Sequence, residues 1–303
     1  MIKVPHYLKA GDTIAITCPA GYMPLEKAAA CIATLQHWGY KVLVGRTLGS
    51  NSENYFSAND ETRTSELQSM LDDRSVNAIL FGRGGYGMSR IIDKLNFSKF
   101  KKHPKWLIGF SDITVMHTHL LANYNIASMH APMAAAFNDG ENHNEYITSL
   151  HDSLEGKKAL YECAPHPYNV HGKAKGILIG GNLTLLAHVI GTDSDFDTED
   201  KILFLEDIGE YIYNADRLLL QLKRSGKFKK IAGIVLGGFT DMKDTERPFG
   251  KTIDEVLKDA THTFKCPVCF HFPVSHEKEN VALKIGLKYQ LLITGDKTIL
   301  KEI

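Results

Sequence analysis

The stretch Trp106-Leu107-Ile108-Gly109-Phe110-Ser111-Asp112-Ile113-Thr114 decides how the first half of this sequence is interpreted. An apolar run ends at a glycine, an aromatic residue and a serine, and a helical pattern containing Val115, Leu120 and Leu121 follows at once. The order strand, tight turn, helix predicts that Ser111 stands clear of the sheet edge at a helix N-terminus. Free backbone N–H groups at such a position can hold a developing oxyanion, so Ser111 is a candidate nucleophile.

A second interpretation of Ser111 stays open from this stretch alone. Serine is a favoured helix N-cap, where its hydroxyl only satisfies a backbone N–H group. The stretch also lacks the full G-x-S-x-G pattern, because Ile113 stands where the second glycine belongs.

Strand and helix patterns alternate on both sides of this stretch. The expected strands cover residues 13–17, 41–44, 77–81, 105–110, 202–205, 231–236 and 268–274, and the expected helices cover residues 25–38, 60–71, 89–95, 215–224 and 253–260. Repeated strand–helix units predict an α/β fold with a parallel sheet covered on both faces. We expect an N-terminal α/β domain over residues 1–140, a connecting segment over 141–172 and a smaller C-terminal α/β domain over 173–303.

Composition excludes several classes of protein. The 35 basic and 35 acidic residues cancel, so no electrostatic footprint for nucleic acid or for an anionic membrane is expected. No apolar stretch is long enough to span a bilayer, and the first residues lack the apolar region of a signal peptide. Five cysteines, an odd number, favour reduced thiols and a cytoplasmic location.

A glycine-rich loop, Gly82-Arg83-Gly84-Gly85-Tyr86-Gly87, follows the strand expected at residues 77–81. It formally matches the G-x-G-x-x-G dinucleotide fingerprint, but no acidic residue follows at the spacing of a ribose contact. Its glycines let a backbone approach a ligand closely and point N–H groups at it, as an oxyanion hole also requires. A nucleotide-binding or sensor protein that uses this loop remains an alternative of a different class.

A serine nucleophile needs a base and a carboxylate that orients the base. In open parallel sheets, sites form beyond the carboxyl ends of the strands. Glu206 follows the expected strand 202–205 and His276 follows the expected strand 268–274, so both take positions comparable to that of Ser111. A solvated carboxylate and an ordinary loop histidine are the alternatives for these two residues.

Motifs along nearly the whole chain resemble those of the LD-carboxypeptidases, the muramoyltetrapeptide carboxypeptidases among the serine peptidases. They are GDTIAITCPAG at 11–21, GRGGYGMSRIID at 82–93, WLIGFSDITVMH at 106–117, HAPM at 130–133, GGNLTLL at 180–186, FLEDIGEYIYNADRLLLQL at 204–222 and SHEKENVALKIG at 275–286. The resemblance implies an N-terminal α/β domain similar to class I glutamine amidotransferases, a smaller C-terminal domain and a homodimer.

The same resemblance assigns roles to residues of this sequence. It implies a triad of Ser111 as nucleophile, Glu206 as orienting carboxylate and His276 as base. Backbone N–H groups of Asp112 and of the Gly84–Gly85 turn would form the oxyanion hole, with no metal and no cofactor. Ser275 departs from the family pattern, where glycine often precedes the histidine, and this puts the local loop backbone in doubt.

The activity that the resemblance implies is hydrolysis of the bond between an L-centre and the terminal D-alanine of a cytoplasmic muropeptide tetrapeptide, in murein recycling. Arg83 in the glycine loop is a candidate for binding the terminal carboxylate, although a structural ion pair or a solvated charge would explain it equally. Some relatives resemble immunity peptidases that cleave peptidyl-nucleotide antibiotics, and this is the alternative activity.

Overall fold

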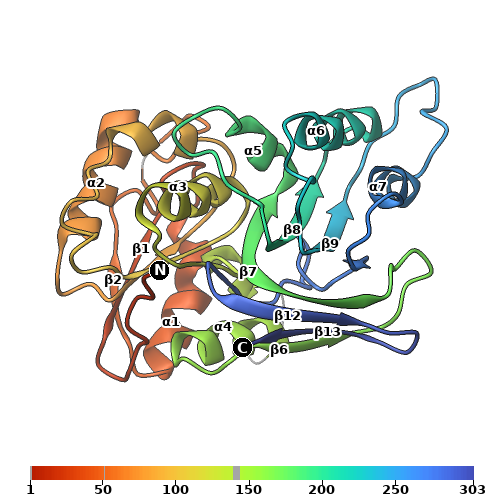
Figure 1. The fold of residues 1–303 in the computed structure, drawn as a ribbon. Coiled ribbons are helices and arrows are strands. Elements are labelled where there is room, and N and C mark those ends of the chain that lie inside the picture. Colours follow the sequence, from red (N-terminus) through yellow and green to blue (C-terminus); the bar gives the residue numbers. More distant parts are fainter. Residues whose placement is uncertain (1, 51, 139–143) are drawn as a thin grey trace. The chain divides into compact units, whose positions relative to one another are not determined.

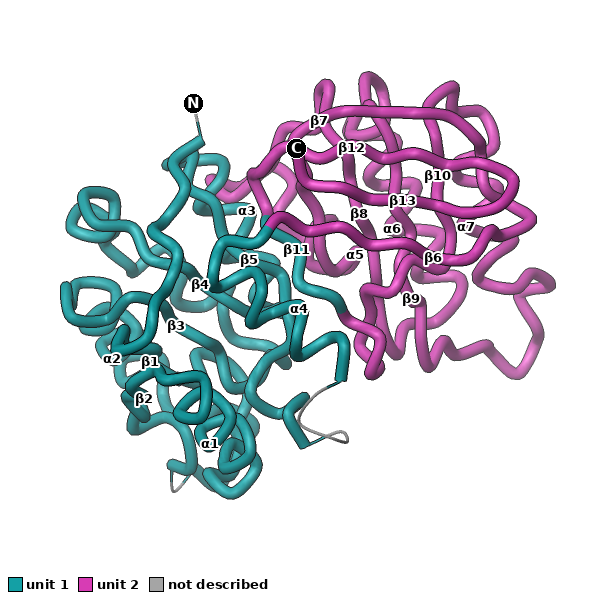
Figure 2. Tube along the Cα trace, turned by 90° about the horizontal axis from the view of Figure 1, so that it is seen from below, with its two compact units in different colours: residues 1–157, 281–284 teal, residues 158–280, 285–303 magenta. Residues whose placement is uncertain are grey.

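Two β-sheets organise the computed structural model, which describes residues 2–50, 52–138 and 144–303. Unit 1 consists of residues 1–157 and 281–284, and unit 2 consists of residues 158–280 and 285–303. Figure 2 colours unit 1 teal and unit 2 magenta, so the return of residues 281–284 to unit 1 can be followed along the tube. Residues 139–143, which span the expected boundary between the N-terminal domain and the connecting segment, lie outside the described residues.

Unit 1 contains a six-stranded sheet in the order β11-β5-β4-β3-β1-β2, and the pairs from β2 through β1, β3 and β4 to β5 are parallel. Its strands are β1 (Thr13–Thr17), β2 (Lys41–Val44), β3 (Ala78–Phe81), β4 (Trp106–Ile108), β5 (Ser128–His130) and β11 (Leu283–Ile285). Its α-helices are α1 (Ala29–His37), α2 (Asp60–Asp72), α3 (Thr114–Tyr124) and α4 (Glu145–Leu154). Strands β3 and β4 are buried along their whole length, as expected for apolar strands covered on both faces.

Unit 2 contains a mixed seven-stranded sheet in the order β10-β9-β8-β7-β12-β13-β6. Its strands are β6 (Leu160–Cys163), β7 (Gly172–Asn182), β8 (Lys201–Ile208), β9 (Gly233–Thr240), β10 (Val268–Cys269), β12 (Lys288–Ile293) and β13 (Thr298–Glu302), and its α-helices are α5 (Leu183–His188), α6 (Ile212–Arg224) and α7 (Ile253–Thr261). Strands β7 to β10 are parallel, and α5, α6 and α7 lie alongside them (Figure 1). The antiparallel strands β12, β13 and β6 complete the sheet.

These two units confirm the expected α/β fold with a parallel sheet and two domains, but the chain divides elsewhere than expected. The boundary falls between Lys157 and Lys158, because α4 lies within the expected connecting segment and packs in unit 1 through buried Leu150 and Leu154. Residues 281–284 also belong to unit 1, where the amide of Ala282 donates to Ser149 Oγ at 2.9 Å.

Some expected elements are different in the structure. The helix expected over residues 89–95 is replaced by two short 3-10 turns, Met88–Arg90 and Ile92–Lys94, and Ile91 between them has a backbone outside the helical region (φ −122°, ψ −16°). Helix α6 begins at Ile212, three residues before the expected start at residue 215, and the side chain of Asn214 within it donates to Glu210. Of the strand expected over residues 268–274, only the short β10 (Val268–Cys269) forms.

Among the described residues, no helix is both long and apolar enough to cross a membrane.

Arg63 on α2 is a fully buried arginine that joins three segments of unit 1. Its guanidinium donates to the carbonyl oxygens of Pro19, Ala58 and Gly87, and it also pairs with Asp60. The loop after β1 and the glycine-rich loop are thus tied to α2 by one side chain. Because buried charges are stable only when paired and hydrogen-bonded, the packing of these loops depends on Arg63.

We predict that Arg63→Met lowers the free energy of unfolding of unit 1 by roughly 3 kcal/mol or more, because three carbonyl oxygens lose their donor and Asp60 loses a partner. Urea unfolding followed by tryptophan fluorescence measures this, since both tryptophans, Trp38 and Trp106, lie in unit 1. The matched variant Arg46→Met removes an arginine whose side chain is 64% exposed and should change stability by less than about 1 kcal/mol. Equal effects of the two variants would contradict this role of Arg63.

Candidate active site

Ser111 lies on the predicted tight turn between β4 and α3. It opens a 3-10 turn, Ser111–Ile113, that leads directly into Thr114 and the rest of α3. The backbone φ angle of Ser111 is 62°, in the left-handed region. A residue with a side chain is disfavoured there by about 1–2 kcal/mol, and such strained positions cluster at functional sites. The expected order of strand, turn and helix is confirmed.

His117 on α3 holds the carbonyl side of this turn. Burial lowers the pKa of His117 to about 4, so the ring is neutral near pH 7 and has one donor and one acceptor nitrogen. Nε2 lies 2.8 Å from the carbonyl oxygen of Gly109, which can only accept, so Nε2 donates. Nδ1 lies 2.8 Å from Ser128 Oγ and accepts from that hydroxyl. The strand-to-helix turn is therefore fixed by a histidine that the sequence motifs did not single out.

The glycine-rich loop lies against Ser111. A Cβ atom placed on Gly84 would stand 2.9 Å from Ser111 Cβ, 3.0 Å from Ser111 Oγ and 3.4 Å from the amide nitrogen of Asp112. Any side chain at Gly84 would therefore collide with the serine, which explains why glycine is needed there. Its neighbour Gly85 has a φ angle of 95°, which also favours glycine.

Asp112 connects the serine turn to the glycine-rich loop. Its carboxylate Oδ2 accepts a hydrogen bond of 2.7 Å from the amide of Met88. Burial raises the pKa of Asp112 to about 6, although the Met88 amide and the charge of Arg63 act in the opposite direction. The side chain of Asp112 thus fixes the loop, while its backbone N–H group stands in the first turn after Ser111.

Arg83 in the same loop is exposed, and its Nη1 donates to the carbonyl oxygen of Tyr22 at 2.8 Å. This bond uses one of the five N–H donors of a guanidinium, so Arg83 can still bind a carboxylate. Its role in substrate binding stays a prediction.

In unit 2, Glu206 and His276 form a buried pair. Glu206 Oε2 lies 2.6 Å from His276 Nδ1, and the Glu206 side chain is fully buried while that of His276 is 11% exposed. Burial alone would lower the pKa of His276, but the charge and hydrogen bond of Glu206 and the charge of Asp207 raise it above the ordinary 6.5. The carboxylate therefore orients the ring and stabilises its protonated form.

The sequence pattern places Glu206 after the end of its strand, but in the structure Glu206 lies inside β8. The pairing of β8 with β9 shifts register between Leu205 and Asp207, because β9 advances from Leu236 to Phe239 over the same interval, so the bulge lies in β9 opposite Glu206. Such bulges re-aim a side chain, and they are frequent beside active sites.

The loop that carries His276 is held by its preceding residue. Ser275 is buried, and its hydroxyl accepts from the amide of Glu277 and donates to the carbonyl oxygen of Glu279, both at 3.0 Å. Gly238 on β9 makes room for it, since a Cβ there would stand 2.5 Å from Ser275 Cβ. Serine in place of the expected glycine therefore bridges across His276.

Asp207 is a further buried carboxylate that the sequence motifs did not single out. Its Oδ1 accepts from Asn182 Nδ2 at 2.7 Å, and its Oδ2 accepts from the amide and hydroxyl of Thr184 at 3.0 and 2.8 Å. Burial and the charge of Glu206 raise the pKa of Asp207 to about 6. The start of α5 is thus fixed next to the strand that carries Glu206.

A separate cluster in unit 2 has the residue types of a metal site. One ligand atom each from His166, Asp254 and His271 lies within 4.8 Å of the others, and His271 Nε2 is 3.0 Å from Asp254 Oδ2. It includes none of the expected site residues.

The structure therefore brings the expected site residues together in two groups. Ser111, Gly84 and Asp112 are neighbours in unit 1, and Glu206 and His276 are bonded in unit 2.

Both parts of the chain match known family models. Residues 14–131 match the LD-carboxypeptidase N-terminal domain, and residues 175–291 match the LD-carboxypeptidase C-terminal domain. The probable murein peptide carboxypeptidase of Bacillus subtilis strain 168 is 34% identical over 301 residues, which cover 98% of this chain and 94% of that protein.

Solved structures agree with these matches. The crystal structure of muramoyltetrapeptide carboxypeptidase from Oxalobacter formigenes is 31% identical, with a TM-score of 0.86, and the match covers 96% of this chain and 98% of that one. The structure of MccF in complex with glutamyl sulfamoyl guanosine has a TM-score of 0.85 at 21% identity, covering 99% and 98% of the two chains, which is a likeness of fold alone.

We predict that Ser111→Gly makes unit 1 more stable than Ser111→Ala by roughly 1 kcal/mol, because glycine relieves the left-handed backbone strain. Ser69, exposed on α2, gives a matched pair in which the order is reversed, since glycine is less stable than alanine inside a helix by about 1 kcal/mol. Urea unfolding by tryptophan fluorescence compares the four variants. If the glycine variant were less stable than the alanine variant at both positions, the backbone of Ser111 would not be strained.

A second prediction concerns the pKa of His276, measured by proton NMR of its imidazole. Glu206→Gln removes the carboxylate charge, so the pKa of His276 should fall below 6.5, as burial then dominates. Asp254→Asn is the matched control, since it should lower the raised pKa of His271 and leave His276 unchanged. A His276 pKa that does not move in Glu206→Gln would rule out the electrostatic pairing.

Proposed function

This chain belongs to the LD-carboxypeptidase family, and on that premise we propose that it acts as a serine carboxypeptidase on muropeptide tetrapeptides. It hydrolyses the bond between the L-centre of the third residue and the terminal D-alanine, leaving a tripeptide. The observation that carries the proposal is Ser111, held at a left-handed backbone position before a helix with Gly84 against its hydroxyl.

The proposed chemistry is that of a serine triad, with Ser111, His276 and Glu206 in the roles of nucleophile, base and orienting carboxylate. Ser111 Oγ attacks the carbonyl carbon of the scissile bond while His276 Nε2 takes the hydroxyl proton. Glu206, bonded to Nδ1, keeps the ring in the required tautomer and stabilises its charged form. His276 then gives the proton to the amine of the leaving D-alanine.

The acyl-enzyme on Ser111 is hydrolysed by water through the same base. The backbone N–H groups of Asp112 and of Gly84 and Gly85 would stabilise the oxyanion in both steps, since the first amides of a helix lack an intrahelical acceptor. Arg83 would bind the terminal carboxylate of D-alanine. No step of this scheme uses a metal or a cofactor. We also propose that the protein acts in the cytoplasm as a homodimer.

The alternative substrate is a peptidyl-nucleotide antibiotic. It has less support, because the likeness to MccF at 21% identity is one of fold, whereas the Bacillus subtilis relative at 34% identity and the Oxalobacter formigenes structure at 31% identity are named as murein peptide and muramoyltetrapeptide carboxypeptidases. Both substrates enter the same assay.

We predict that the wild type releases D-alanine from purified muropeptide tetrapeptide and that Ser111→Ala reduces this release to background, because the acyl-enzyme cannot form. Mass analysis of the products measures the change from tetrapeptide to tripeptide. Ser69→Ala, on the exposed face of α2, should retain full activity. Release of D-alanine by Ser111→Ala at the wild-type rate would contradict the assignment of Ser111 as nucleophile. Exclusive cleavage of the antibiotic by the wild type would favour the alternative substrate.

The activity should also depend on pH through His276. The base must be neutral to accept a proton, and its folded-state pKa is raised, so kcat/KM should rise with pH with its inflection above 6.5. The same raised pKa means that the pair stabilises the fold fully below pH 6.5 and loses this contribution as the pH rises through the folded pKa.

Asp112 also titrates near this range, with a pKa of about 6, so Asp112→Asn serves as the control. That variant keeps the backbone N–H group and should leave the inflection of His276 in place. A kcat/KM that falls as the pH rises from 6 to 8 would contradict the role of His276 as base.

A further inference from the structure

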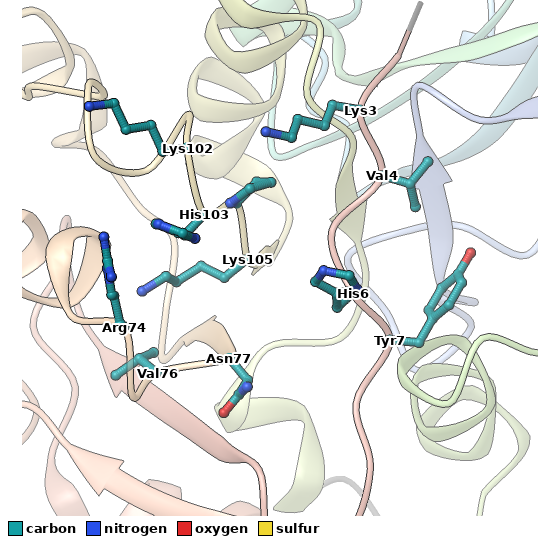
Figure 3. A pocket seen from close by; sticks show the side chains of 11 residues that line it. Lys3, Val4, His6, Tyr7, Arg74, Val76, Asn77, Lys102, His103 and Lys105 are labelled. Carbon is teal, nitrogen blue, oxygen red and sulfur yellow. The ribbon is translucent and has the colours of Figure 1, made fainter.

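A basic pocket lies at the edge of unit 1 opposite to Ser111. It has a volume of about 290 Å³ and is formed by the segment before β1 and by the loops that precede β3 and β4. Its lining residues are Lys3, Val4, His6, Tyr7, Arg74, Val76, Asn77, Lys102, His103, Pro104 and Lys105. Figure 3 shows Lys3 and Arg74 on opposite sides of this pocket, with His103 and Lys105 between them.

The charged side chains that line this basic pocket are all bases, and no acidic side chain lines it. Four lysine or arginine side chains and two histidines line it, and no aspartate or glutamate does. The carboxylates of Asp72 and Asp73 act electrostatically on Lys105 but do not line the pocket; Asp72 pairs with Lys99 at 3.2 Å, and Asp73 accepts from the amide and hydroxyl of Ser75. Since the whole chain carries equal numbers of acidic and basic residues, the positive charge is a local feature of this pocket.

Lys105 places an ammonium group at the buried end of the pocket. Only 4% of the residue is exposed, and Nζ donates to the carbonyl oxygens of Met70, at 2.8 Å, and Asp73. Burial lowers the pKa of Lys105 to about 8, despite the opposing charges of Asp73 and Asp72. An ammonium group has three donors, so one remains beyond the two carbonyl bonds. A buried cation with a spare donor is favourable for binding an anion.

The walls of the basic pocket are ordered before any ligand binds. The amide of Lys3 donates to Asn125 at 2.7 Å, and Lys3 Nζ donates to the carbonyl oxygen of Lys101 at 2.8 Å. Tyr7 stacks on Trp106, with ring centroids 5.6 Å apart. Asn77 Oδ1 accepts from the amide of Thr13 at 2.9 Å, which ties the pocket floor to β1.

Arg74 and Lys102 are exposed at the mouth of the pocket. Within the described ranges, neither side chain has a hydrogen bond or an ion pair. Their charges can therefore turn to a ligand without breaking an existing interaction.

We propose that the basic pocket binds a small phosphorylated molecule, with its phosphoryl group held by Arg74, Lys102 and Lys105. Arginine and lysine together suit a group with about two negative charges and three acceptor oxygens. The volume accommodates a phosphoryl group with an attached part of sugar size, against Val4 and Tyr7. A phosphate backbone of nucleic acid fits less well, because it requires an extended basic surface on the protein.

This site is separate from the one at Ser111. In a parallel sheet the amino ends of all strands lie at one edge, and Val76, Asn77 and Lys105 directly precede β3 and β4. Ser111 follows β4 at the carboxyl edge of the same sheet. A ligand in the basic pocket would thus bind whether or not Ser111 reacts.

The experiment is calorimetric titration of the Ser111→Ala protein with inorganic phosphate, ribose 5-phosphate, ribose and citrate at constant ionic strength. The serine variant prevents turnover, so the result is independent of the proposed peptidase activity. We expect saturable binding of ribose 5-phosphate and of phosphate at one site per chain, weaker binding of citrate, and no binding of ribose.

The pocket variant Arg74→Gln/Lys102→Gln should weaken the binding of ribose 5-phosphate at least about tenfold, which corresponds to about 1.4 kcal/mol. The control Arg224→Gln/Lys301→Gln removes the same two residue types from exposed positions of unit 2 and should bind as before. Proton NMR of His6 and His103, whose resonances should shift on titration, shows independently that the ligand enters this pocket.

Three outcomes would overturn the proposal. The first is that neither phosphate compound binds saturably up to about 10 mM, a limit that corresponds to a free energy of binding of about 3 kcal/mol. The second is that binding weakens equally in the pocket and control variants. The third is that citrate binds more tightly than ribose 5-phosphate.

Discussion

The close approach of the glycine-rich loop to Ser111 is the constraint on which the candidate site depends. Gly84 has no room for a side chain, because a Cβ there would reach within 3.0 Å of both Cβ and Oγ of the serine. Ser111 in turn adopts a left-handed backbone that its side chain disfavours. The absence of a side chain at Gly84 and the strained backbone of Ser111 together bring backbone N–H groups close to a hydroxyl. Oxyanion stabilisation needs this arrangement.

Buried polar side chains stabilise this arrangement. Arg63 joins α2 to the loops at Pro19 and Gly87, Asp112 holds the amide of Met88, and His117 fixes the carbonyl group of Gly109. Each forms a hydrogen bond with a backbone group of the segments around Ser111. In unit 2, Asp207 has the equivalent role beside Glu206. The reactive groups are therefore positioned by hydrogen bonds as well as by packing.

Local sequence patterns predict the elements that are decided locally. Strands β1 and β2 have the expected bounds, and the strand, turn and helix around Ser111 form as expected, since apolar runs and turn residues decide them. The helix expected over residues 89–95 does not form, and two 3-10 turns separated by Ile91 take its place.

Features that depend on contacts distant in sequence could not be predicted in this way. The return of residues 281–284 to unit 1 and the bulge in β9 opposite Glu206 leave no periodic signal. Positions at the ends of expected strands make Glu206 and His276 candidates, the family motifs assign their roles, and in the structure the two side chains are hydrogen-bonded to each other. Lys105 directly precedes the apolar run at residues 106–108, but Arg63 stands among polar and charged residues, so nothing in the local sequence indicates its burial.

The central claim is that Ser111 is a nucleophile activated by His276. Its most direct test is reaction with a fluorophosphonate that modifies activated serines, followed by peptide mass spectrometry. The account predicts one adduct per chain, on Ser111, and labelling that is slower by roughly a hundredfold or more in His276→Ala. An adduct on another residue, or an unchanged labelling rate in His276→Ala, would contradict it.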